Sequence, residues 1–153
     1  MRNEQSMKQA EIWTITSPNS SVTKSVTLVL KVVNIETLVP VFIDQSESQA
    51  LLKVLHKRIL SNRPLVHGAL LSLMEDAGFS LFEAELYDIH DDILLARVLF
   101  EGQDSAEKPL TAPVTPSDAC ILATLAECPI YVGNNVIEQM GVPVGMELDK
   151  LCL

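Results

Sequence analysis

The sequence predicts a single α+β domain (mixed α/β), in which an antiparallel-rich β-sheet packs with three to four α-helices. Strand-like segments come first, a pair of segments with helical periodicity follows, and then a hairpin pattern, a capped helix and a further strand. The 153 residues suffice for one domain with its own core and are too few for two. We therefore expect a flexible N-terminal segment over residues 1–10, the domain over 11–140 and a tail over 141–153.

Composition narrows the class of protein. Hydrophobic residues make up 48% and charged residues 20%, as in ordinary globular proteins. The net charge of −9 argues against capture of nucleic acid by the molecule as a whole, so a polyanion would need a local basic patch or a bound cation. The three cysteines, without a CxxC pair, indicate reduced thiols rather than disulfides or a zinc site. With no apolar leader and no membrane-length run, we expect a cytoplasmic protein without a membrane partner.

The first third of the chain predicts three strands. Glu11–Thr16, Val22–Val33 and Leu38–Ile43 are rich in β-branched and apolar residues. A turn cluster over 17–21 separates the first two, and Asn34–Glu36 separates the second from the third. Consecutive strands joined by short turns favour an antiparallel meander.

Two helices are predicted next, and both are expected on one face of the sheet. From Asp44 to Leu60 the apolar residues recur at helical spacing, and Asp44 or Ser46 is a suitable cap. Gly78 occupies the position where a glycine ends the second helix. The apolar face expected for that helix consists of Leu70, Leu73, Met74 and Ala77.

A hairpin is the clearest strand signal. Phe79–Ile89 alternates in polarity, His90-Asp91-Asp92 forms a turn, and Ile93–Phe100 returns as an almost continuous apolar strand. The alternation places Glu83 and Glu85 on one side of the first strand, which we interpret as the side facing water.

A capped helix follows the short strand expected over Pro109–Val114. Thr115 is a good N-cap, Pro116 suits the first helical position, and Asp118 completes a capping-box spacing. The helix ends at Cys128-Pro129 and a short strand, Ile130–Val132, comes directly after it. A last small helix is predicted over Asn134–Met140, closed by Gly141.

Cations gather in one stretch of this acidic chain: Lys53, His56, Lys57, Arg58, Arg63 and His67. One interpretation is a binding site for phosphate or nucleic acid. The other is a solvated helix face, whose cations suit the negative end of the helix dipole.

Carboxylates are the second candidate group. Glu47 and Asp118, with acidic residues of the hairpin, are candidates for binding Mg²⁺ or Mn²⁺ in phosphodiester hydrolysis. For Asp118, a capping role and a functional role are compatible. His67 is either a hydrogen-bonded residue at a helix start or a general base. The sequence contains no phosphate-binding glycine loop, GxSxG or HExxH motif.

Four blocks in register resemble the bifunctional nuclease domain family. They are the apolar strand Leu38–Ile43 with Glu47 after it, Arg63–His67 (RPLVH), Pro116–Ala119 (PSDA) and Pro129–Val132 (PIYV). The resemblance covers about residues 11–140. It implies a domain that forms homodimers and hydrolyses DNA and RNA. For such an activity we expect a divalent cation, Mg²⁺ or Mn²⁺, as cofactor, because it would offset the acidic surface.

Carried over by position, the family blocks imply Glu47, His67 and Asp118 as catalytic candidates. Arg63 and Ser117, with Lys53, Lys57 and Arg58 from the basic stretch, are the candidates for contacting the nucleic acid. The chain departs from the family pattern at three positions: Val66, Gly68 and Thr115 replace Thr, Asp and Arg. These departures motivate the alternative of a non-catalytic dimeric binding or regulatory module on the same fold.

Overall fold

The predicted strands join into one sheet. The computed structural model describes residues 6–16, 25–55, 65–104 and 108–145. Within these ranges the strands are β1 (Met7–Thr16), β2 (Ser25–Val32), β3 (Thr37–Asp44), β4 (Phe79–His90), β5 (Ile93–Gly102), β6 (Leu110–Val114), β7 (Ile130–Gly133) and β8 (Val142–Pro143). The helices are α1 (Gln45–Leu55), α2 (Val66–Asp76), α3 (Pro116–Ala126) and α4 (Asn134–Met140).

The sheet order is β6-β5-β4-β7-β1-β2-β3-β8, and neighbours are antiparallel except for the parallel pair β4–β7. The expected meander of β1–β3 and the β4–β5 hairpin are confirmed. β1 begins at Met7 rather than Glu11, because residues 7–10 pair with β7. Four residues of the segment expected to be flexible therefore belong to the sheet.

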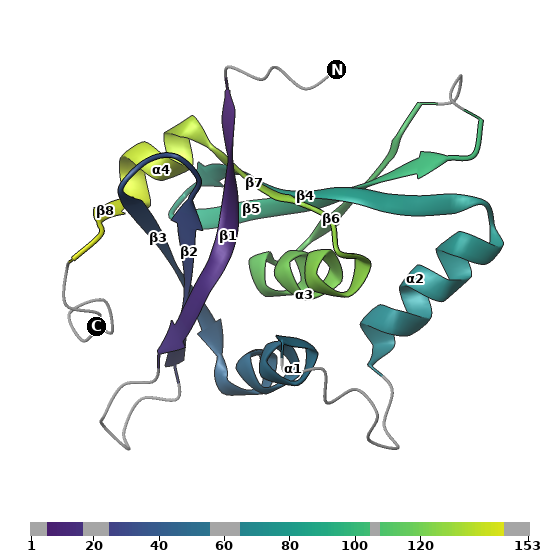
Figure 1. Ribbon diagram of the computed structural model, residues 1–153, viewed down its shortest axis with the longest axis horizontal. Coiled ribbons are helices and arrows are strands. Elements are labelled where there is room, and N and C mark those ends of the chain that lie inside the picture. Colours follow the sequence, from purple (N-terminus) through teal and green to yellow (C-terminus); the bar gives the residue numbers. More distant parts are fainter. Residues whose placement is uncertain (1–5, 17–24, 56–64, 105–107, 146–153) are drawn as a thin grey trace.

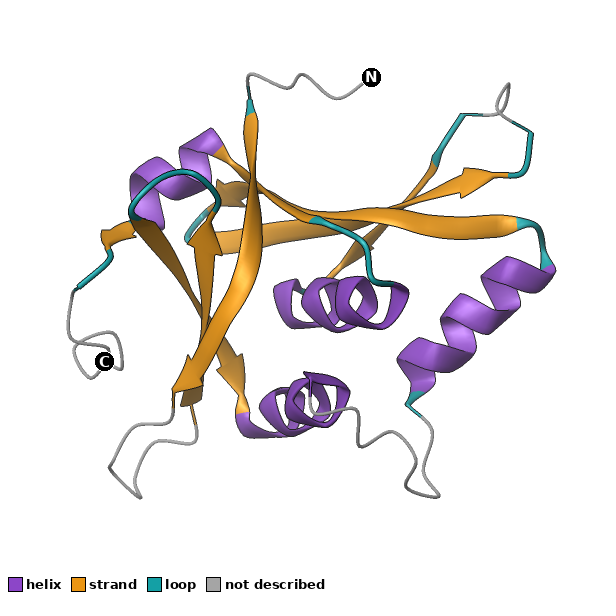
Figure 2. Cartoon of the chain, viewed as in Figure 1, coloured by secondary structure: helices purple, strands orange, loops and turns teal. Residues whose placement is uncertain are grey.

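Helices α1, α2 and α3 lie on one side of β4 and β5 (Figures 1 and 2), as expected. Between them and the strands lies the core, where Ala84, Leu86 and Val98 are fully buried and Leu122 of α3 is 1% exposed. These strand residues occupy alternate positions and so point to the helical side of the sheet. Helix α4 is separate from these three helices and packs against β3, β4 and β7.

The face of α2 that meets the core differs in part from the prediction. Met74 packs against the core as expected, but Leu70 and Leu73 are 40% and 67% exposed, and Leu71 packs against the core instead. Helix α2 lies at one end of the molecule and packs against α3 and β4 (Figure 1). The prediction was wrong for Leu70 and Leu73 because apolar residues run around most of this helix, and its sequence alone gives no direction for the core.

Helix α3 starts and stops where its sequence predicts. Thr115 is extended at the N-cap, its Oγ1 accepts a hydrogen bond from the Asp118 N–H at 3.2 Å, and Pro116 is the first helical residue. At the other end Glu127 adopts a left-handed conformation (φ 54°), which ends the helix before Pro129. The helix is lined with small buried residues such as Ala119 and Ala123, so it can lie close to the sheet.

We expect Thr115→Ala to lower the free energy of unfolding by about 1 kcal/mol, because the Asp118 N–H loses its acceptor. Urea denaturation followed by circular dichroism measures the change. Thr115→Ser keeps the hydroxyl and should stay within a few tenths of a kcal/mol of the parent. An equal loss in both variants would contradict the capping role.

Two of the three cysteines are placed, and both are free thiols, as expected. Cys120 is fully buried on α3, and Cys128 is partly buried after the helix. Burial raises the pKa of Cys120 to about 12 and that of Cys128 to about 11. Cys152 lies outside the described residues.

Both thiols should therefore react slowly with iodoacetamide at pH 8. A thiol with a pKa near 11 is ionised to only about one part in a thousand at that pH, and the thiolate is the reactive form. Labelling of a Cys152→Ser variant, followed by mass spectrometry with and without guanidinium, tests this. Labelling of the folded protein as fast as that of the unfolded protein would contradict it.

Candidate functional site

The structure brings His67 and Asp118 together across 51 positions of sequence. His67 lies in the first turn of α2, Asp118 in the first turn of α3, and the two helices pack against each other. The Nε2 atom of His67 is 2.8 Å from Oδ1 of Asp118. The side chains are 21% and 40% exposed, so the carboxylate is the member of the pair that is more open to solvent.

The protonation of the pair follows from this contact. An ionised carboxylate only accepts hydrogen bonds, so the proton between the two groups belongs to Nε2 of His67. The other ring nitrogen, Nδ1, is buried and has no hydrogen-bond partner among the described residues. His67 thus fixes the Asp118 carboxylate, while its own second nitrogen points into the protein. The positive end of the α3 dipole also stabilises the negative charge of Asp118.

The backbone and the side chain of Asp118 have different hydrogen-bond partners. Its backbone N–H is capped by Thr115. Among the hydrogen bonds of the described residues, its carboxylate is joined to His67 rather than to the N–H of Thr115. The capping box is therefore only half formed, and the side chain is available to the site.

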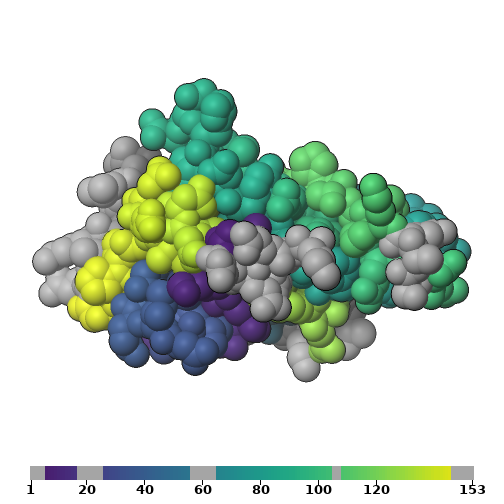
Figure 3. Space-filling view, turned by 90° about the horizontal axis from the view of Figure 1, so that it is seen from above, coloured from purple at the N-terminus to yellow at the C-terminus, as the bar shows by residue number. Residues whose placement is uncertain are grey.

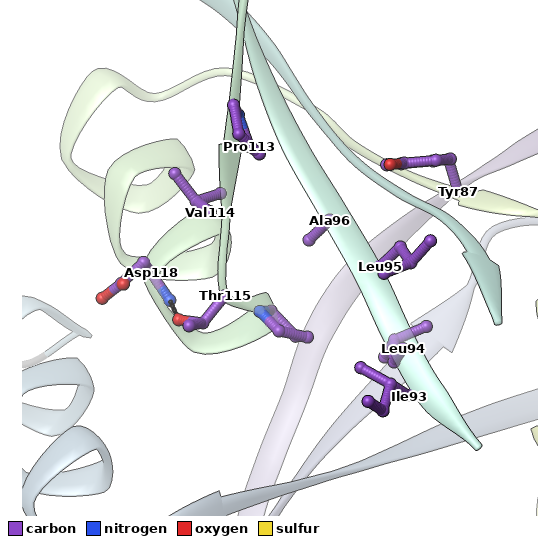
Figure 4. Close-up of a pocket in the computed structure, with 10 residues that line it drawn as sticks. Tyr87, Ile93, Leu94, Leu95, Ala96, Pro113, Val114, Thr115 and Asp118 are labelled. Carbon is purple, nitrogen blue, oxygen red and sulfur yellow. Dashed lines mark hydrogen bonds between the residues drawn. The ribbon is translucent and has the colours of Figure 1, made fainter. Parts of the chain in front are cut away.

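A pocket of about 590 Å³ borders Asp118. It lies where β6 ends and α3 begins, and Leu94, Ala96 and Val114 are among its apolar lining (Figure 4). Thr115 and Asp118 form part of the wall. In Figure 4 the Asp118 carboxylate points away from Leu94, so the charged group lies beside the pocket rather than within it.

Glu47 is held at the start of α1. Its Oε2 accepts a hydrogen bond from the Asp44 N–H at 3.0 Å, and Oδ1 of Asp44 accepts one from the Glu47 N–H at 2.8 Å. This reciprocal arrangement is a capping box, and it confirms Asp44 as the predicted cap. Hydrogen bonds from the Glu47 N–H and the Ser46 hydroxyl lower the pKa of Asp44. One oxygen of Glu47 is thus engaged in a structural role.

The predicted anion-binding residues are placed only in part. Lys53 is exposed on α1. Lys57, Arg58 and Arg63 lie outside the described residues, and their role stays a prediction. Ser117 is 1% exposed, and its hydroxyl is 3.1 Å from that of Thr115, so it does not face solvent.

The described ranges bring only two candidate donors for a metal ion together. Within those ranges no three His, Cys, Asp or Glu side chains gather as a metal site requires. His67 and Asp118 supply two donors and are hydrogen-bonded to each other. Binding of Mg²⁺ or Mn²⁺ remains a prediction.

Comparison with known proteins decides the family. The family model for the bifunctional nuclease domain matches residues 28–145. The chain belongs to this family. Two uncharacterized proteins of Mycobacterium tuberculosis, Rv1829 of strain H37Rv and MT1877 of strain CDC 1551, are each 28% identical to it over 123 residues. The alignment covers 80% of this chain and 71% of each relative.

Both members of the His67–Asp118 pair, and Glu47, fall within the span matched to the bifunctional nuclease domain. The family model also reaches beyond residue 140, the expected end of the domain, to include β8. None of the helices in the described ranges is long and apolar enough to cross a membrane.

Sequence reasoning missed a buried charged cluster on the other face of the sheet. Glu83 and Glu85, expected to face water, are only 7% and 2% exposed. Glu85 accepts a hydrogen bond from Nε of Arg97 at 2.6 Å, and the Arg97 guanidinium lies 4.2 Å from the centre of the Tyr87 ring. The expectation was wrong because alternation gives the face of a strand but not the side chains that cover it. A signal available in the sequence was Arg97, a charged residue within the otherwise apolar strand Ile93–Phe100.

Proposed function

We propose that the chain hydrolyses phosphodiester bonds of DNA and RNA, with Asp118 as the general base and His67 as the residue that positions it. The observation that carries the proposal is the 2.8 Å contact between Nε2 of His67 and Oδ1 of Asp118. It occurs at a helix start, beside a pocket, in a member of the bifunctional nuclease domain family.

The chemistry follows from the exposed carboxylate. Asp118 accepts a proton from a water molecule as the water oxygen attacks phosphorus. The bond from phosphorus to the leaving oxygen breaks, and that oxygen takes up a proton from solvent water to leave as a hydroxyl group. The Nε2–H of His67 keeps the carboxylate in one orientation during this step.

Approach of an anionic substrate to Asp118 requires compensating positive charge. Lys53, Lys57, Arg58 and Arg63 are proposed to supply it, together with a divalent cation, Mg²⁺ or Mn²⁺. Glu47 is a second carboxylate that could act as a base or bind the cation, although one of its oxygens accepts a hydrogen bond at the start of α1. The cation supplies charge neutralisation at the phosphate when bound.

The test is cleavage of single-stranded DNA, double-stranded DNA and RNA by the purified protein, with Mg²⁺, with Mn²⁺ and with EDTA. Cleavage that EDTA abolishes supports a metal-dependent nuclease, and cleavage that EDTA leaves unchanged removes the metal from the proposal. No cleavage of any substrate would favour the binding or regulatory module. The departures at Val66, Gly68 and Thr115 are the observation that favours this second candidate.

Variants of His67 separate positioning from proton transfer. The amide nitrogen of glutamine can replace Nε2 as a donor to Asp118, so His67→Gln should retain most of the activity, whereas His67→Ala should lose it. Equal loss in both variants would mean that the imidazole itself carries the proton.

We also propose that the chain forms a homodimer through α2. Val66, Leu70 and Leu73 form an apolar stripe at helical spacing, exposed by 82%, 40% and 67%. Two copies of α2 packed antiparallel would cover both stripes. They would also place the acidic end, Glu75 and Asp76, beside the positive N-terminal end of the opposite helix.

Light scattering after size exclusion tests the homodimer. The parent protein should run with twice the chain mass, and Leu73→Lys should shift it to the monomer because a charge would enter the apolar contact. Leu52→Lys, which also replaces an exposed leucine but on α1, is the matched control and should remain dimeric. A monomeric parent protein would overturn this proposal and leave the nuclease proposal in place.

A further inference from the structure

A second pocket lies on the face of the sheet that is turned away from α3. Its volume is about 610 Å³, within the range of small-molecule sites. Because Ala84, Leu86 and Val98 point toward the helices, the alternate residues Glu83, Glu85, Arg97 and Leu99 point to the opposite face. Figure 3 looks onto this face of the molecule. The pocket is thus separated from the His67–Asp118 pair by the sheet.

The deepest charged groups of the pocket are carboxylates. Glu83 is 7% exposed and Glu85 is 2% exposed. Burial of carboxylates is costly unless cations or donors compensate them, and Arg97 does this for Glu85 at 2.6 Å. An ionised carboxylate has room for about four hydrogen bonds, so Glu83 can accept from a bound ligand in addition to its protein partner.

The cations of the pocket lie nearer to solvent. Arg97 is 36% exposed and is held between the Glu85 carboxylate and the Tyr87 ring. Lys108 is exposed on the approach to β6. The pocket therefore has negative charge in its floor and positive charge at its rim, with Phe82 and Leu99 as apolar walls.

We propose that this pocket binds a free α-amino acid with an apolar side chain. Its ammonium group would meet Glu83 in the floor, and its carboxylate would lie between Arg97 and Lys108 at the rim. The apolar side chain would pack against Phe82 and Leu99. A ligand with only negative charge would be repelled by the carboxylates in the floor of the pocket, and a ligand with only positive charge would be repelled by the cations at its rim. The charge distribution therefore selects a ligand that carries both charges. This site is independent of the proposed nuclease activity.

The first experiment compares three ligands of the same shape on the parent protein: leucine, 4-methylpentanoate without the amine, and 3-methylbutylamine without the carboxylate. At about ten times its dissociation constant, leucine should raise the midpoint of thermal unfolding by about 3 °C, and the other two should have no effect. A shift by 4-methylpentanoate as large as that by leucine would overturn the proposal, because the site would then be a simple anion site. The absence of a shift with both leucine and phenylalanine at about 10 mM would also overturn it.

Variants then assign the contacts by isothermal titration of leucine. Lys108→Ala and Glu83→Gln should each weaken binding by about tenfold or more, since each removes one charge–charge contact. Lys8→Ala, which removes an exposed lysine of β1 outside the pocket, is the matched control and should bind as the parent does. Lys108 is exposed, so its variant folds even if Glu83→Gln does not. Unchanged leucine affinity in Lys108→Ala would overturn the proposal.

Discussion

Asp118→Asn is expected to reduce phosphodiester cleavage at least about 100-fold, the scale of general acid–base catalysis. The amide has the shape of the carboxylate and can still bond to His67, but it cannot accept a proton from water. The loss should fall on kcat with little change in KM, because the substituted group acts in the transition state. Steady-state kinetics on the substrate that the parent protein cleaves fastest measures the effect.

The matched control for this prediction is Glu11→Gln, which makes the corresponding carboxylate-to-amide substitution at an exposed position of β1, away from α2 and α3. Its cleavage rate should equal that of the parent. Circular dichroism and the midpoint of unfolding show whether Asp118→Asn retains the fold, since its backbone N–H still meets Thr115. Equal rates for Asp118→Asn and the parent would overturn the role of Asp118, once a mock purification without the protein has excluded a contaminating nuclease.

Features that depend on neighbouring residues were predictable from the sequence. The cap at Thr115, the end of α2 at Gly78 and the start of α1 at Asp44 are each decided within a few positions. The hairpin turn was predictable for the same reason, because it too is decided by neighbouring residues. Asp91 and Asp92 both have positive φ, 50° and 63°, as a two-residue turn between antiparallel strands requires.

Features that depend on distant contacts were not predictable from pattern alone. The parallel pairing of β4 with β7 joins strands that are distant in the sequence, and His67 comes close to Asp118 only because α2 and α3 pack together. The family blocks singled out both residues, but only the fold shows that the first orients the second. The burial of Glu85 was missed for the same reason, because its partners Arg97 and Tyr87 are contributed by the folded hairpin.

Arg97→Met is expected to lower the free energy of unfolding by about 3 kcal/mol, the largest stability effect that we predict for a single substitution. The variant leaves the Glu85 carboxylate, 2% exposed, without the cation that lies 2.6 Å from it. It also removes the guanidinium from the Tyr87 ring. The thermal midpoint should fall by about 6–12 °C for a chain of this size.

The double variant Arg97→Met/Glu85→Leu separates the two possible origins of that loss. If the loss comes from an uncompensated buried charge, removal of the carboxylate should restore most of the stability, because apolar side chains of similar volume often replace a buried ion pair at little cost. If the loss comes from packing of Arg97 on Tyr87, the double variant should be at least as unstable as Arg97→Met. Chemical denaturation measures the free energy of unfolding of the parent, both single variants and the double variant. Together the four values complete the double-mutant cycle. Recovery in the double variant would show that β4 tolerates an apolar residue at this position and that the ion pair adds little net stability to the sheet.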